Sequence, residues 1–180
     1  MDLDRSAEKL ISACQRLAPI HPDYANLPIQ EGFNWSSCLD DVPFTRLYLV
    51  VFRSVRRPAA DLETLREHDD RAYEEALRAG GLLYYFKGQV NEARECLSFC
   101  LWRSREEARA AAGGGYHRAA AAISIEMYEV YGLERFFIMR TEGTGLTFWA
   151  LPTDQASNSP SPQRSARQNQ ALEGRSSPVY

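Results

Sequence analysis

The sequence is poor in the residues that build metal sites and disulfide frameworks. It has only three histidines, His21, His68 and His117, and no His/Glu/Asp triplet has the spacing of metal ligands. The four cysteines show no C-x-x-C spacing, and we expect them to be buried free thiols, with a reactive cysteine as the alternative. We therefore predict neither a metal nor another cofactor.

Long apolar runs and a surplus of positive charge are also missing. No stretch approaches the roughly 18 apolar residues that a membrane span needs, and the acidic start, residues 1–5, is unlike a secretory signal. A net charge of −3 without a basic stripe argues against nucleic-acid binding. The sequence therefore predicts a cytoplasmic protein with no membrane and no nucleic-acid partner.

The composition that remains suits one folded domain with additional chain at both ends. Of 180 residues, 44% are hydrophobic and 25% are charged, enough for a sizeable core. Residues 1–45 predict a helix over 4–17 and an ordered arm, because Phe33 and Trp35 are costly to leave in water. Residues 46–151 form the domain. Residues 152–180, rich in Ser, Pro, Gln and Arg, predict a disordered tail.

The domain shows alternating strand and helix patterns. Strands are expected at 46–53, 82–87, 95–102 and 133–140, and helices at 61–79, 104–112 and 116–131. Asp61 and Ser104 are expected to cap the first two of these helices. Residues 145–151 predict a fifth edge strand or a swapped arm. The order predicts an α+β domain with an antiparallel four-stranded sheet.

Two of the predicted strands have no solvated face. Residues 46–53 and 95–102 are apolar on both sides, but the helices of such a domain cover only one face of its sheet. A second copy of the chain is the simplest cover for the other face, so we expect a homodimer. The alternative is that residues 23–43 or 145–151 cover that face.

The order of elements and one local run resemble a known superfamily. The βαββαβ order resembles the ferredoxin-like unit of the dimeric α/β barrels. The run from Cys100 to Ala108, followed by Tyr116-His117, resembles the strand-to-helix junction of antibiotic-biosynthesis monooxygenases. Residues 1–150, with Gly32-Phe33-Asn34-Trp35, resemble an uncharacterised fungal family of this fold. The resemblance implies a dimeric barrel, whose relatives include cofactor-free oxygenases, isomerases, cyclases, decarboxylases and non-catalytic proteins.

His117 is the first candidate catalytic residue. It follows three glycines at the start of a predicted helix, where an imidazole can reach a cavity and act as a general base or acid. The alternative is a helix-start residue that is exposed or bonded to the backbone.

Asp69 is the second candidate. It occupies the sheet-facing stripe of the helix 61–79, where it either pairs with an arginine such as Arg53 or Arg140 or lines a pocket. His68 is its sequence neighbour, but adjacent residues on a helix point about 100° apart, so the two form no dyad.

A predicted substrate site combines side chains from two strands. Tyr85, which shares a strand face with Lys87, would form an apolar pocket with Ser98, Trp102 and His117, and His68 is a further candidate. The alternative is that the tyrosine and the tryptophan are core or dimer-interface residues. The leading hypothesis is a cofactor-free enzyme acting on a hydrophobic, aromatic or polyketide-like molecule; the rival is a non-catalytic binding or stress-related dimer.

Overall fold

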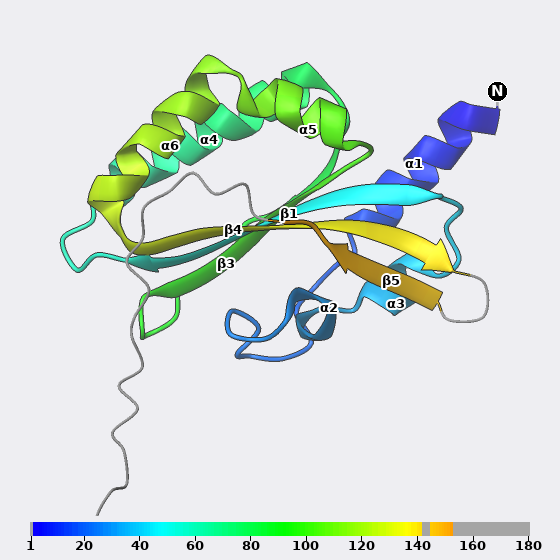
Figure 1. Cartoon of the computed structure of the whole chain (residues 1–180), viewed down its shortest axis with the longest axis horizontal. Coiled ribbons are helices and arrows are strands. Elements are labelled where there is room, and N and C mark those ends of the chain that lie inside the picture. The colour runs from blue at the N-terminus through cyan, green and yellow to red at the C-terminus, as the bar shows by residue number, and fades with distance from the viewer. Residues whose placement is uncertain (1, 142–144, 153–180) are drawn as a thin grey trace, which may run out of the picture.

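A computed structural model describes residues 2–141 and 145–152 of the chain. It contains one five-stranded sheet with helices on both faces (Figure 1). The elements are α1 (Asp2–Cys14), α2 (Ile29–Gly32), α3 (Trp35–Leu39), β1 (Arg46–Arg56), α4 (Leu62–Ala79), β2 (Leu82–Phe86), β3 (Glu95–Trp102), α5 (Arg105–Ala112), α6 (Gly115–Met127), β4 (Tyr128–Thr141) and β5 (Gly145–Ala150). The tail predicted to be disordered lies, from residue 153 on, outside the described residues.

The sheet has the strand order β2-β3-β1-β4-β5, and all neighbouring strands are antiparallel. With α4 between β1 and β2 and α6 before β4, this is the ferredoxin-like α+β fold expected from the sequence. The sheet has five strands rather than four, because β5 pairs with β4 as an edge strand.

The predicted boundary between the last helix and its strand was wrong. We expected helix over 116–131 with Gly132 as its stop, but α6 ends at Met127 and β4 begins at Tyr128. The reason is the length of β1, which continues to Arg56 and pairs with β4 over its whole extent. A helix there would leave the backbone groups at the end of β1 without partners.

Both predicted helix caps are confirmed. The Asp61 carboxylate accepts hydrogen bonds from the backbone N–H groups of Glu63 and Thr64 at the start of α4. The Ser104 hydroxyl accepts from the Glu107 N–H and donates to its carboxylate at the start of α5. These contacts satisfy N–H groups that the helices themselves leave free.

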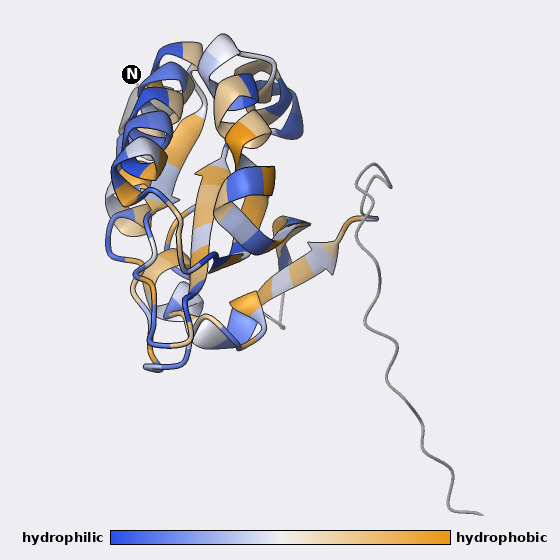
Figure 2. Ribbon diagram, turned by 90° about the vertical axis from the view of Figure 1, so that its left-hand side faces the viewer, coloured by the Kyte–Doolittle hydropathy of each residue, from blue (hydrophilic) through white to orange (hydrophobic). Residues whose placement is uncertain are grey.

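The face of the sheet away from α4, α5 and α6 is covered by the chain's own N-terminal segment. The segment consists of α1 and an arm, residues 19–44, which includes α2 and α3 (Figure 1). Phe33 and Trp35 of the arm are 3% exposed and pack on Phe99 of β3 with ring centroids 5.1 and 5.2 Å apart. In Figure 2 apolar residues are concentrated in the strands, and the helices carry more of the hydrophilic residues.

Two arginines of the sheet hold the arm by its backbone. Arg53 on β1 donates to the carbonyls of Ala25 and Leu27 at 2.5 and 2.7 Å, and its Nε contacts Glu134 at 2.6 Å. Arg140 on β4 donates to the carbonyls of Leu39, Asp40 and Val42, at the end of α3. Positive charge suits this position because the last carbonyls of a helix lack internal partners.

This arrangement removes the reason for expecting a homodimer. The second face was assigned to a partner chain, but the arm and α1 bury it. Arg53 and Arg140, suggested as partners of Asp69, are occupied by the arm instead. A homodimer therefore stays a prediction, and it has no access to this face while the arm is in place.

Candidate functional site

The helix-covered face of the sheet is closed at one end and loosely covered at the other. At the closed end Tyr48 and Trp102, each 3% exposed, pack with Ala76 of α4 and with Ala108 and Ala111 of α5. Towards the other end α6 contributes no buried residue. At that end, the helix-covered face of the sheet carries side chains that are only half-buried, namely Val50, Phe52, Ser98, Cys100, Leu133 and Arg135.

Asp69 lies at the centre of this loosely covered half. It projects from the sheet-facing side of α4, where the helical period places it in line with the buried Leu65 and Ala76. Its Oδ1 accepts a hydrogen bond of 2.6 Å from the Tyr85 hydroxyl of β2. Burial, together with the Asp69 carboxylate, raises the pKa of Tyr85, which therefore stays protonated and remains a donor.

Lys87 brings a positive charge to the same carboxylate. Its Nζ lies 2.6 Å from Asp69 Oδ2 and 3.1 Å from the exposed Asp70. Burial lowers the pKa of Lys87, but the two carboxylates outweigh that effect and the net shift is upward. The contact with Asp69 is an ion pair without hydrogen-bond alignment, so Oδ2, itself buried, accepts no hydrogen bond from the described residues.

Aromatic rings and thiols surround this group. The rings of Tyr73 and Tyr85 lie 5.4 Å apart, and those of Tyr128 and Tyr131 stack at 5.3 Å. Burial, with a further contribution from the Asp69 charge, raises the pKa of the Cys100 thiol. The result is one carboxylate that is bound by Tyr85 and Lys87 and lies among aromatic rings and protonated thiols.

His117 occupies a different position, at the start of α6. The Glu75 carboxylate of α4 accepts hydrogen bonds from the backbone N–H groups of Tyr116 and His117, at 3.3 and 2.9 Å, and lies 2.9 Å from His117 Nδ1. The imidazole, followed by these N–H donors, lowers the pKa of Glu75 to about 2. Glu75 thus caps α6 from the neighbouring helix, because the N-cap residue Gly114 has no side chain to do so.

The structure brings some of the predicted site residues together and leaves others apart. Asp69 and Tyr85 are in contact. Ser98 lies on the same strand face but accepts a hydrogen bond from the Gly88 N–H, and Trp102 is buried in the closed end. His68 is half-buried on α4, and His117 pairs with Glu75 and forms no hydrogen bond or ion pair with the other predicted site residues in the described chain.

Two residues of these clusters were not assigned a role from the sequence. The alternation of side chains along β2 predicted that Lys87 lies on the same face as Tyr85, but it did not predict that Lys87 pairs with Asp69 of α4. Glu75 gave no signal, because its role depends on how α4 packs on α6. No group of three or more His, Cys, Asp and Glu side chains in the described ranges is arranged to hold a metal ion.

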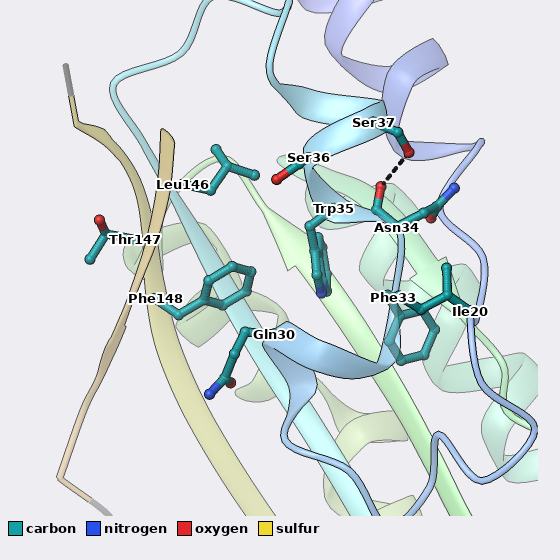
Figure 3. Close-up of a pocket in the computed structure, with 10 residues that line it drawn as sticks. All are labelled: Ile20, Gln30, Phe33, Asn34, Trp35, Ser36, Ser37, Leu146, Thr147 and Phe148. Carbon is teal, nitrogen blue, oxygen red and sulfur yellow. Dashed lines mark hydrogen bonds between the residues drawn. The ribbon is translucent and has the colours of Figure 1, made fainter. Parts of the chain in front are cut away.

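A cavity of about 550 Å³ lies on the opposite face of the sheet, between the arm and β5 (Figure 3). Its walls are Ile20, Gln30, Phe33, Asn34, Trp35, Ser36, Ser37, Leu146, Thr147 and Phe148. It includes none of the residues predicted to form a site.

No helix in the part of the chain that the structure describes is long and apolar enough to cross a membrane.

Comparison of the sequence with known families identifies a family whose match covers nearly all of the described chain. The profile of the PB2B2.08-like family matches residues 1–151. The chain belongs to this family. A curated relative, the UPF0643 protein PB2B2.08 of Schizosaccharomyces pombe, is 28% identical over 137 residues, 67% of this chain. The match spans 62% of that relative's length.

Solved structures share the fold at low identity. Rv0793 from Mycobacterium tuberculosis is 20% identical, with a TM-score of 0.45 over 62% of this chain and 99% of its own. The cofactor-independent oxygenase SnoaB from Streptomyces nogalater is 11% identical, with a TM-score of 0.44 over 56% of this chain and 99% of its own. These similarities concern the fold alone. The same limit applies to the resemblance of the sequence to monooxygenases.

Proposed function

We propose that this family member binds a hydrophobic, aromatic molecule on the helix-covered face of its sheet and transfers a proton on it without a cofactor. The observation that carries the proposal is the Asp69 carboxylate on this face, with Oδ1 bound by the Tyr85 hydroxyl and Oδ2 in contact with the Lys87 ammonium at 2.6 Å. A carboxylate in such surroundings can accept a proton from carbon or oxygen of a bound molecule. Isomerisation, cyclisation and oxygenation by O2 of an aromatic or polyketide-like substrate can each begin with such a step, and decarboxylation ends with the return of a proton to carbon.

Each neighbour of Asp69 has a distinct part in this proposal. Tyr85 donates to Oδ1 and is a positioning residue, and a substrate would reach Oδ2 by taking the place of the Lys87 ammonium. Lys87 supplies a positive charge 2.6 Å from Oδ2 and is the ion-pair partner of the carboxylate. Ser98, Trp102 and His68 remain proposed substrate-binding residues, of which Ser98 lies on the loosely covered half of the face.

His117 is a second proposed acid–base group. If Nδ1–H donates to Glu75, the imidazole Nε2 is left as a hydrogen-bond acceptor, which is the arrangement of a general base held in one tautomer. This role is separate from that of Asp69, because no hydrogen bond or ion pair joins the two side chains in the described chain. The same assay can therefore test each of them.

A non-catalytic binding protein is the second candidate function. The observation that favours it is the close pairing of Asp69 with Lys87 and Tyr85, which also describes a structural ion pair. In that case replacing Asp69 changes the stability of the protein, and neither the variant nor the wild type converts a ligand.

The cytoplasmic location and the homodimer expected from the sequence also stay proposals. Imaging of the tagged chain would test the first, and sedimentation would test the second.

The proposal is tested by native mass spectrometry of the full chain purified from its own host. If Asp69 moves the proton, Asp69→Asn should retain substrate and slow turnover about 100-fold, whereas the wild type should retain product or nothing. The mass difference between the two bound molecules identifies the reaction class. Asp70→Asn is the matched control, because Asp70 also contacts Lys87 but is exposed.

Three outcomes separate the hypotheses. The same bound mass in the wild type and in a folded Asp69→Asn protein would support the non-catalytic function. Loss of turnover in His117→Ala but not in Asp69→Asn would move the acid–base role to His117. A protein that retains no organic mass in any variant, and converts none, would contradict the proposed function.

A further inference from the structure

The cavity between the arm and β5 is a candidate binding site that is separate from Asp69. We propose that it binds an uncharged, flat molecule with the size of one or two aromatic rings and one hydrogen-bonding group. Its volume of about 550 Å³ lies within the range of small-molecule sites. The inference does not depend on the proposed function, because the two sites lie on opposite faces of the sheet.

The chemistry of the walls favours an uncharged ligand. None of the ten lining side chains is ionisable. A charged ligand would lose hydration on entry and would find no opposite charge in return, which is costly. A neutral ligand meets no such penalty.

The aromatic wall of the cavity is rigid. The Trp35 indole N–H donates to the Ile29 carbonyl at 2.7 Å, which fixes the ring. Phe148 of β5 lies against it, with ring centroids 5.3 Å apart and an interplanar angle of 68°. Figure 3 shows Trp35 between Phe148 and Phe33. Rings held in this way suit a flat apolar ligand, because aromatic pairs favour defined edge-to-face or offset contacts.

Two polar side chains of the cavity are free to recognise the ligand. Asn34 is occupied by the Ala18 N–H and the Arg16 carbonyl, and the Ser37 hydroxyl donates to the Asn34 carbonyl. By contrast, Gln30 and Ser36 make no side-chain hydrogen bond within the described residues. In Figure 3 both lie on the side of Trp35 that faces β5. An amide and a hydroxyl there can pair with a hydroxyl or carbonyl group of the ligand.

The test uses the three tryptophan indole signals of the ¹⁵N-labelled full chain, from Trp35, Trp102 and Trp149. The probes are 2-naphthol and 2-naphthalenesulfonate, which share a ring system and differ in charge. We expect 2-naphthol to shift the Trp35 signal saturably, and the sulfonate to bind about tenfold more weakly or not at all. Failure of 2-naphthol to shift Trp35, or equal binding of both probes, would overturn the proposal.

Two substitutions place the binding in the cavity. Ser36→Phe projects a ring into it and should weaken 2-naphthol binding about tenfold by loss of space, whereas Ser12→Phe puts the same ring on an exposed position of α1. Asp69→Asn should leave the affinity unchanged. Unaltered binding in a folded Ser36→Phe protein, or loss of binding in Asp69→Asn, would contradict the assignment.

Discussion

At the scale of single residues, Glu75 joins two helices through one carboxylate. Its pKa falls from an ordinary 4.5 to about 2 because the imidazole and N–H groups of α6 favour the ionised form. A carboxyl group whose pKa is depressed in the folded state stabilises the fold at pH values above its unfolded-state pKa. This contribution is lost as the pH falls through the folded-state pKa. Glu75→Gln should therefore lower the midpoint of thermal unfolding at pH 7 by about 3 °C.

The pH dependence separates this effect from a general loss of packing. The difference between wild type and Glu75→Gln should shrink as the pH falls from 4.5 towards about 2, as followed by circular dichroism. Glu74→Gln is the control, because the Glu74 side chain is 66% exposed and pairs only loosely with Arg78 at 3.6 Å. A difference that stays constant down to pH 2 would show that the ionised carboxylate contributes nothing.

At the scale of elements, Gly114 at the start of α6 lies against the Glu75 carboxyl group of α4. A Cβ at this position would overlap the Glu75 carboxyl group, whereas a Cβ at Gly115 would meet nothing within 4 Å. Gly114→Ala should displace the Glu75 cap and lower the unfolding midpoint. Gly115→Ala should leave it unchanged or raise it slightly, because alanine favours the helix. Equal midpoints for the two variants in differential scanning calorimetry would refute this role for Gly114.

The elements also show how far the sequence alone could lead. Periodicity and cap residues such as Asp61 and Ser104 predicted the order of helices and strands, because those signals are local. The end of α6 was missed because only the pairing of Val130 with Val55 on β1 decides it. In the same way, the helical stripe predicted Asp69 on the sheet side, but its contacts with Tyr85 and Lys87 depend on packing between elements.

At the scale of the whole molecule, the arm determines which surfaces another chain can reach. The sheet is apolar on both faces, and the face opposite α4, α5 and α6 is covered by a segment held at its backbone by Arg53 and Arg140. The cover is therefore part of the monomer, although the strand pattern alone is equally consistent with a partner. Where the arm comes away, the apolar face becomes a surface on which copies of the chain can associate.

The double variant Arg53→Met, Arg140→Met tests this consequence. It removes the clamps but leaves the apolar contacts of the arm, so the chain should fold with a less firmly held arm. We expect its weight-average mass in sedimentation velocity at micromolar concentration to exceed that of the wild type, whose arm blocks the face. Hydrogen exchange should rise in residues 19–44 and not in α4. Arg66→Met with Arg71→Met, on the exposed side of α4, is the control. An unchanged mass together with faster exchange in the arm would show that the uncovered face does not drive association.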